Sequence, residues 1–354
     1  MRCSKRQNMS NSVFIKNLYT KCRIHGTGEA QVAISDAEIY SLIVLAIHDL
    51  NWSLDEFGIK QISLPALNYY EISLDWFDSL GNTGVTPEKI LSMLTACFNK
   101  AQDFALFIEN LSSLHRRRIK FKRILSNQPF PSMEQIGPRI LLEYGICDIE
   151  LLANWMTWRK WIYDIDNRSA QETGYLFEPI LASSLGGETV GAKNSPIKRI
   201  DENGNVTNSG RQVDCLIADT NTAYELKLRV TVAASGQGRF AEELSFPVEC
   251  QAAGYKPVLL VLDPSSSDRL KELAKKYLEF GGELIQGEQA WMHMEQRAGI
   301  VMSIFINKYI KPAIKLIDDV EVKWPQKISL EWYGDSIKIS NESVNYTISR
   351  KSGG

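Results

Sequence analysis

The chain has few histidines and no closely spaced cysteines, which argues against a structural zinc site and against a disulfide framework. Its 354 residues include four histidines and six cysteines, the latter scattered at positions 3, 22, 97, 147, 215 and 250. A structural zinc site or a disulfide framework needs closely spaced Cys or Cys/His ligands, and no CxxC pair occurs. We therefore expect neither, and a reducing cytoplasm is the compartment that fits best.

Long apolar runs are also missing. The run SLIVLAI at residues 41–47 is far too short to span a bilayer. The basic N-terminus lacks an apolar stretch of signal-peptide length. We expect a soluble protein with no membrane partner.

Charge of one sign does not dominate either. Forty Lys and Arg residues face 42 Asp and Glu residues, so the formal net charge is −2. A DNA-binding protein with this balance must concentrate its basic residues locally. GxSxG, P-loop and GxGxxG motifs are absent, which removes the best-known nucleophile and nucleotide signatures.

What the sequence does contain is a mainly helical first half followed by a mixed region. Apolar residues recur at helical spacing over 35–165, beginning with Ser35 and Glu38 in a capping-box pattern and with Pro87 near a helix start. A further helix is expected over 170–186. Strands joined by turns follow, then a helical stretch around Pro247, a buried strand in KPVLLVLDP, an amphipathic helix from SDRLKELAKKYLEF, and a helix over 288–317.

This order predicts a mixed α/β fold with a sheet flanked by helices. The tail, 326–349, alternates apolar and polar residues in KISLEWY, IKIS and VNYTISR, which GDS and NES separate, and this predicts a small β meander. We expect three domains: a helical N-terminal region (1–165) for DNA clamping or dimerisation, an α/β core (166–320), and the meander (321–354).

The segment VDCLIADTNTAYELKLRV, residues 213–230, predicts two strands that carry unusual charges. Side chains alternate faces along a strand, so Glu225 and Lys227 point the same way. With Thr220 and Asn221 as the turn, Asp214 lies opposite Lys227 on that face. Two carboxylates and an ammonium then share a small volume, and carboxylate oxygens are the ligands that Mg²⁺ prefers. An ordinary solvent-exposed charge trio is the plain alternative.

Asp214 followed by Glu225-Leu226-Lys227, within this order of elements, resembles the PD-(D/E)xK nuclease superfamily over residues 170–285. The family often has Pro before its first Asp, where this chain has Val213. The resemblance implies a restriction-endonuclease-like mixed sheet. It also implies Mg²⁺ bound by Asp214, Glu225 and the Leu226 carbonyl, with Lys227 at the attacking water or the scissile phosphate.

An acid on the helix before the first strand often completes the metal site in that family, and Glu178 in YLFEPILASSL matches it. Glu178 could instead be a surface residue at a helix start, because Pro179 follows it. The resemblance implies a catalytic role for Glu178.

A longer stretch, AYELKLRVTVAASGQGRFAEELSFPVECQAAGYKPVLLVLDP, is similar to the ApaLI-like restriction endonuclease family. This implies a type II enzyme that cleaves double-stranded DNA at a palindrome, GTGCAC in the type enzyme. Cleaving both strands of a palindrome takes two active sites, so we expect a homodimer. A repair or recombination nuclease of the same fold, and a non-catalytic DNA-binding protein, are the alternatives.

Candidate DNA contacts lie around this motif. The loop with Ser235, Gln237 and Arg239 has small residues that let backbone amides approach a phosphate, and Arg239 suits a phosphate or guanine. Gln251 and Tyr255 are spaced to share a helix face, although core packing explains Tyr255 equally well. Basic residues also surround the first strands, namely Lys193, Lys198, Arg199 and Arg211.

Two further patterns lie outside the motif. HRRR at 115–118, with Lys120, Lys122 and Arg123, is the densest basic run, and is either a DNA contact or a solvated helix face. Trp155, Trp158 and Trp161 recur every three residues. A face packed into the core explains them better than a platform for stacking bases.

Overall fold

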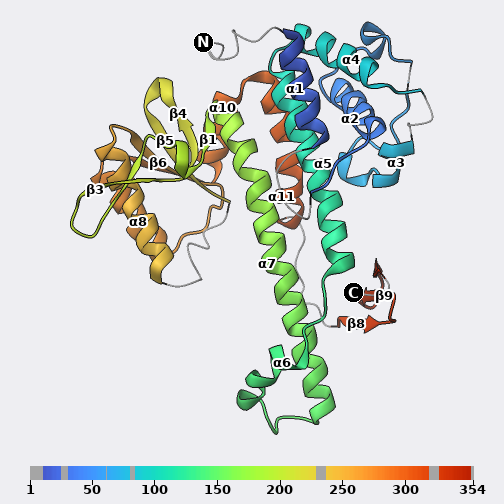
Figure 1. The fold of residues 1–354 in the computed structure, drawn as a ribbon, viewed down its shortest axis with the longest axis vertical. Coiled ribbons are helices and arrows are strands. Elements are labelled where there is room, and N and C mark those ends of the chain that lie inside the picture. Colours follow the sequence, from blue (N-terminus) through green and yellow to red (C-terminus); the bar gives the residue numbers. More distant parts are fainter. Residues whose placement is uncertain are drawn as a thin grey trace.

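The computed structural model describes residues 11–24, 31–60, 62–79, 84–228, 237–318 and 327–351. It confirms the mixed α/β class. Figure 1 shows a helical lobe and a sheet lobe beside one end of a long helix, α7 (Ile149–Leu185), whose other end projects away from both. No helix in the described ranges is long and apolar enough to cross a membrane.

The helical lobe is built around an almost wholly buried helix, α2 (Asp36–Asp49). The expected capping box is present, because Ser35 Oγ accepts the Glu38 N–H while Glu38 accepts the Ser35 N–H. Pro87 is the first residue of its helix, as expected. The other helices of this lobe are α1 (Asn11–Arg23), α3 (Leu74–Ser79), α4 (Pro87–Lys100) and α5 (Phe104–Asn127), with 3₁₀ turns at Leu54–Phe57 and Tyr69–Glu71.

Helix α7 runs for 37 residues, where the sequence indicated two helices with the second over 170–186. Pro179 lies inside it and Gly174 does not break it. Packing at both ends overrides these breakers: Ile180 and Leu181 are buried against the sheet lobe, and Trp161 is buried at 2% exposure farther along. The helix therefore passes through residue 165, where a domain boundary was expected.

The sheet has five strands in the order β1-β4-β5-β6-β7. Pairings β1–β4 and β4–β5 are antiparallel, whereas β5–β6 and β6–β7 are parallel. The strands are β1 (Glu188–Val190), β4 (Val213–Ile217), β5 (Thr222–Lys227), β6 (Lys256–Val261) and β7 (Glu283–Gln286). The short β7 was not foreseen. Strands β2 (Lys198–Ile200) and β3 (Val206–Gly210) form a separate two-stranded ribbon.

Helices cover both faces of the sheet. On one face Tyr224 and Leu260 join the same apolar cluster as Ile180 of α7 and Met294 of α10 (Glu288–Phe305). On the other face Leu259 packs with residues of α8 (Gln237–Ala252) and α9 (Asp268–Glu279). Helix α8 is continuous through Pro247, and the expected final helix is α10, a π turn (Ile306–Ile310) and α11 (Lys311–Asp318).

The helical lobe and the sheet lobe share one hydrophobic core. The cluster that holds Tyr224 and Leu260 of the sheet also holds Leu42 of α2 and Phe107 of α5. A common core of this kind resists separation of its parts, because pulling them apart would expose apolar surface to water.

The meander is present as β8 (Ser329–Trp332), β9 (Ser336–Ser340) and β10 (Asn345–Ser349). It packs on the middle of α7, where Trp158 and Trp161 meet Phe130, Ile337 and Ile348. Trp158 and Trp161 are thus packing residues, as the plainer interpretation had it. Trp155 is different, because half of its side chain is exposed.

Candidate active site

The charged hairpin forms between β4 and β5, with a register different from the one expected. Cys215 pairs with Tyr224 and Ile217 with Thr222, so Asp214 falls opposite Glu225 and not opposite Lys227. The reason is the turn: residues 218–220 form a 3₁₀ turn and Asn221 adopts a left-handed φ of 48°, which makes the loop two residues longer. A shift of two residues preserves the faces, so all three charges remain together.

Asp214 is held by the neighbouring strand. Its Oδ2 accepts a hydrogen bond of 3.0 Å from the Leu226 backbone N–H. Burial raises the pKa of this carboxyl well above its ordinary value, and the charges of Glu225 and Glu178 add to the rise, while the Leu226 N–H and Lys227 oppose it. Asp214 is therefore an acid whose negative charge is poorly compensated in this site.

Lys227 lies between two glutamates. Its Nζ is 2.9 Å from Glu225 Oε1 and 3.0 Å from Glu243 Oε1. Burial by itself lowers the pKa of Lys227, but the two carboxylates outweigh burial and the net shift is upward. Lys227 is accordingly a fixed positive charge at neutral pH in this arrangement.

Glu243, on α8, is a site residue that the sequence reasoning missed. A signal for it existed: Phe246 and Cys250, three and seven residues later, are buried on the same helix face. A carboxylate on that apolar stripe needs a partner, and Lys227 supplies one. Glu243 Oε2, also buried, has no hydrogen-bond partner among the described residues.

Glu178 joins the cluster from α7. It lies inside that helix, not at a helix start, and its side chain is partly buried. Burial raises the pKa of Glu178, Glu225 raises it further, and Lys227 lowers it. The long helix thus brings a third acid within electrostatic range of Asp214 and Glu225.

This donor set suits a hard divalent cation in its chemistry. Buried carboxylates that repel one another, together with an unpartnered oxygen, are relieved by a positive ion. In the described part of the chain, no group of three or more His, Cys, Asp and Glu side chains is arranged to hold a metal ion. The ligand set expected from the sequence has two carboxylates and a backbone carbonyl, so it does not need three such side chains.

Known proteins match the chain over most of its length. The ApaLI-like restriction endonuclease family matches residues 65–311. A type II restriction enzyme, ApaLI of Acetobacter pasteurianus, is 48% identical over 303 residues, covering 83% of this chain and 80% of its own. The chain belongs to the ApaLI-like restriction endonuclease family. The type II restriction endonuclease expected from the sequence is thereby confirmed. No solved structure matches the chain.

Within this ApaLI-like enzyme, part of the expected DNA-contact loop lies outside the described residues. Ser235 is one such residue. Gln237 begins helix α8 and Arg239 lies in its first turn, but their side chains also lie outside what is described. Glu243 of the same helix contacts Lys227, so Gln237 lies six residues along α8 from a contact with the candidate site.

Arg211 is buried and serves packing. Its guanidinium lies 3.3 Å from Glu249 Oε2 and donates to the Glu242 carbonyl (2.6 Å) and to Ser245 Oγ (3.2 Å). A guanidinium enclosed in this way has little left to offer a phosphate, which argues against the expected DNA contact; Arg211 instead ties the segment between β3 and β4 to α8. Lys198 is partly buried and donates to the Ser195 carbonyl at 3.1 Å.

Gln251 and Tyr255 do not share a helix face. Helix α8 ends at Ala252, and Gly254 turns the chain with a φ of 78°. Gln251 is therefore exposed at the helix end, while Tyr255 packs partly buried beside the α8–α9 side of the sheet. The packing alternative holds for Tyr255.

The basic run on α5 divides into structural and free cations. His115 and Arg116 are buried, and Arg116 donates to the Lys21 and Cys22 carbonyls. Arg117 and Lys120 both pair with Glu172 of α7. For Arg118, Lys122 and Arg123, the described residues provide no ion pair.

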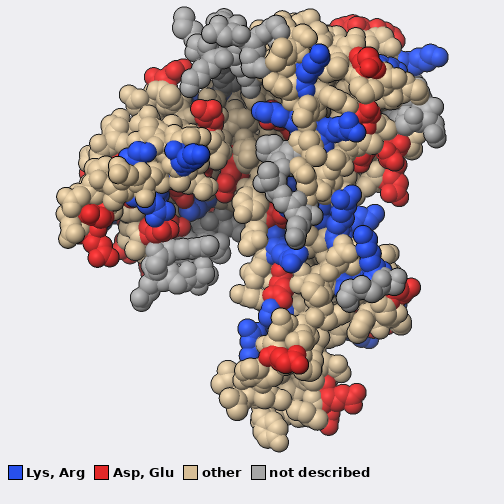
Figure 2. All heavy atoms as spheres, in the orientation of Figure 1, with Lys and Arg blue, Asp and Glu red and all other residues tan. Residues whose placement is uncertain are grey.

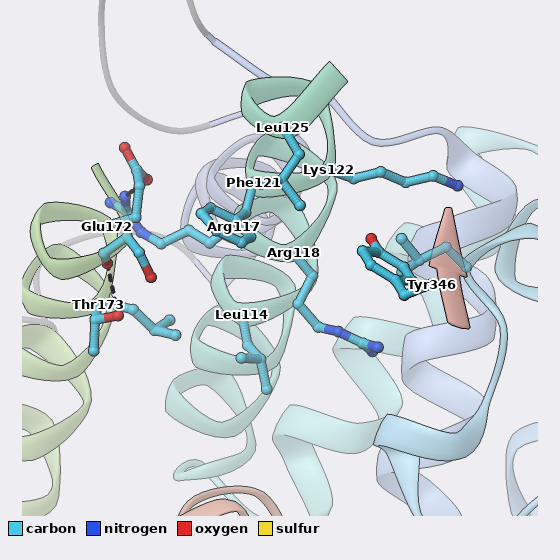
Figure 3. Close-up of a pocket in the computed structure, with 12 residues that line it drawn as sticks. Leu114, Arg117, Arg118, Phe121, Lys122, Leu125, Glu172, Thr173 and Tyr346 are labelled. Carbon is cyan, nitrogen blue, oxygen red and sulfur yellow. Dashed lines mark hydrogen bonds and ion pairs between the residues drawn. The ribbon is translucent and has the colours of Figure 1, made fainter. Parts of the chain in front are cut away.

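Some of these cations line a hollow of about 530 Å³ between α5, α7 and β10. Figure 3 shows Arg117 directed at Glu172, while Lys122 extends the other way on the side of Tyr346. The Arg118 guanidinium lies 4.7 Å from the Tyr69 ring, and its Nη1 is buried with no hydrogen-bond partner among the described residues. Only the last part of the basic run is therefore available to an anion.

Proposed function

We propose that this enzyme is a Mg²⁺-dependent homodimer that cuts both strands of a DNA palindrome, GTGCAC. One observation carries the chemistry: in a chain of this family, Asp214, Glu225 and Lys227 converge on adjacent strands beside Glu178. The identity of 48% to ApaLI supports the same class of site. GTGCAC is the sequence that the family resemblance implies.

Asp214, Glu225 and the Leu226 carbonyl are the proposed Mg²⁺ ligands, and Glu178 assists from α7. Mg²⁺ bound there would lower the pKa of the attacking water and stabilise the charge that develops on the phosphate. The Leu226 N–H holds Asp214 in orientation through its 3.0 Å hydrogen bond. Because Asp214 and Glu178 are costly to ionise while uncompensated, a cation should bind tightly and release protons.

Lys227 is the proposed contact to the scissile phosphate or to the attacking water. Two carboxylates keep it protonated, so it acts first as a positive hydrogen-bond donor. Glu243 is the proposed positioning residue, because it holds the ammonium on the side of α8 when Glu225 is engaged elsewhere. A general-base role for Lys227 would require the carboxylate charges to be neutralised first.

The remaining expectations stand as proposals. Lys122 and neighbouring cations of α5 extend the DNA contact, together with Arg239, Gln237, Ser235, Lys198 and Gln251. The cytoplasm is the proposed compartment, and the free cysteines at 22, 97, 147, 215 and 250 suit it.

Plasmid digestion with Mg²⁺ tests the proposal directly. We expect discrete fragments whose ends, read by run-off sequencing, fall within GTGCAC. A plasmid in which every GTGCAC has been changed by one base pair is the matched control and should remain intact. Fragments ending at another palindrome would overturn the proposed site and leave the enzyme class standing. A smear would overturn sequence specificity.

A further inference from the structure

The far end of α7 carries a projection that we call the arm, residues 133–163. It consists of α6 (Met133–Ile136), a 3₁₀ segment (Gly137–Leu142), the loop that follows and the first part of α7. Figure 1 shows it extending away from both lobes. Its own core is small: Ile136, Leu152 and Met156 are buried, with Ile140 packed against them.

The tip of the arm exposes large apolar side chains side by side in the chain. Leu141 is 84% exposed, Leu142 87%, Tyr144 76% and Ile146 73%. Single exposed apolar residues are normal, but a contiguous group marks a surface that something covers. Figure 2 shows the arm as mainly uncharged, with few acidic or basic side chains.

The apolar surface continues along α7. Leu151 is 60% exposed, Trp155 51% and Ile162 45%, at helical spacings of four and seven. They share one face of the helix, different from the faces that bury Met156 against α6 and Trp161 against the meander. The arm therefore presents a stripe that the rest of this chain does not cover within the described residues.

The charge of the arm argues against DNA as the occupant. It contains four acidic residues (134, 143, 148, 150) and three basic ones (139, 159, 160), so its net charge is −1. A DNA backbone contact needs an excess of Lys and Arg. Two of the three cations, Arg159 and Lys160, also pair within the chain, with Glu143 and Asp164.

We propose that the arm is the homodimer interface, with a second copy of this chain as its occupant. An antiparallel contact about a two-fold axis near Trp155 brings the two Trp155 side chains together and lays the exposed Leu151 and Ile162 of each α7 along the shared surface. This assignment rests on the proposed function, because cutting both strands of a palindrome takes two active sites. The position of the contact is argued separately, from the exposed apolar side chains of the arm.

The apolar area is large enough for such a contact. Nine large apolar side chains of the arm are more than half exposed (133, 141, 142, 144, 146, 149, 151, 155, 163). An aromatic side chain buries about 150–250 Å². With the aliphatic ones, the set approaches the roughly 800 Å² per partner of a standard specific interface.

The test is the mass of the protein in sedimentation equilibrium without DNA. At micromolar concentration we expect wild-type protein at twice the chain mass of 40.0 kDa. The double variant Leu142→Asp, Tyr144→Asp should sediment as a monomer, with its dimer dissociation constant raised by roughly 100-fold or more. Leu278→Asp, 64% exposed on α9 and outside the arm, is the matched control and should remain a dimer.

A cross-link checks the geometry near the proposed two-fold axis. Trp155→Cys, in a chain whose Cys147 and Cys3 are changed to Ser, should form a disulfide-linked dimer on oxidation, because two copies meet near the axis. Leu278→Cys in the same background should not. A wild-type monomer, or a double variant that stays dimeric and folded by circular dichroism, would overturn the arm as the interface.

Plasmid cleavage distinguishes this failure from failure of the proposed function. If the arm is the interface, the wild type converts supercoiled plasmid to linear DNA, while the double variant accumulates nicked circles. A wild type that cleaves at GTGCAC yet sediments as a monomer refutes the dimer alone. A dimer dissociated by the arm variant but inactive on every plasmid supports the interface and refutes the function.

Discussion

Folded proteins usually expose charged side chains and bury apolar ones, and the sheet lobe and the arm depart from this rule in opposite ways. In the sheet lobe, Asp214, Glu225, Lys227 and Glu243 place four charges in a largely enclosed site. In the arm, Leu142 and its neighbours leave apolar side chains in water. Burying charge and exposing apolar area both cost free energy, so a folded chain keeps such places where something else will occupy them.

The difference lies in what each place lacks. In the described part of the sheet site, carboxylates outnumber the lysine, Lys227, that pairs with them, and a cation with DNA would compensate the excess negative charge. The arm lacks apolar cover and has nearly balanced charge, which suits a protein surface. The same reasoning from burial thus assigns two different classes of occupant.

The largest expected effect comes from Lys227 of the sheet site. Lys227→Ala should lower the rate of DNA cleavage by about 10²–10⁴-fold, because a positioned charge at the reacting phosphate is lost. Specific DNA binding, measured by gel shift with Ca²⁺, should stay within a few fold. Lys256→Ala, which breaks the exposed Lys256–Glu283 pair, is the control and should cleave normally. If both variants lost the same fraction of the cleavage rate, Lys227 would be no more important to cleavage than a lysine in an ordinary surface ion pair.

A smaller effect is expected at Glu243, which acts through Lys227. Glu243→Gln should slow cleavage about tenfold, in the range of coupled neighbours. It should also lower the pKa of Lys227, since a raising charge is removed. In a Lys227→Ala background the same change should have no further effect. Additive losses in this double-mutant cycle would show that Glu243 does not position the lysine.

The buried acid predicts a pH-dependent stability. The pKa of Asp214 is raised in the folded state, so the metal-free protein loses stability as pH rises from about 4 through that raised value. Asp214→Asn keeps an acceptor for the Leu226 N–H without the charge. Its Tm without metal should exceed that of wild type by about 2–4 °C at pH 7 and match it near pH 4. Thermal unfolding with EDTA measures this.

The same two proteins can be compared by thermal unfolding in the presence of Mg²⁺. The metal should raise the Tm of the wild type and have little effect on Asp214→Asn. An equal rise in both proteins would place the bound ion away from Asp214.

The smallest effect is expected from the free cations beside the hollow of Figure 3. Lys122→Ala should weaken DNA binding uniformly across sequences and lower the slope of log K against log salt by about 1. Lys120→Ala is the matched control, because Lys120 is held in an ion pair with Glu172. A salt dependence unchanged in both variants would remove α5 from the DNA-binding surface.

Much of the site could be read from the sequence, because hairpin patterning is local. Alternation along a strand placed Glu225 and Lys227 on one face, and the turn residues fixed which strand Asp214 belongs to. The register was wrong by two residues, since a 3₁₀ turn at 218–220 cannot be distinguished from a tighter turn by composition alone. Glu243 was missed because it reaches Lys227 from a helix sixteen residues away.

The sequence by itself indicated the mixed class and the meander through short-range periodicity, and the candidate charged residues through strand alternation together with the family resemblance. Only the tertiary structure decided that α7 runs unbroken through Pro179, that one core joins both lobes, that Arg211 is a packing residue, and that the arm leaves its apolar face open. Each of these depends on which distant surfaces bury one another, and burial is a property of the folded chain, not of its local pattern.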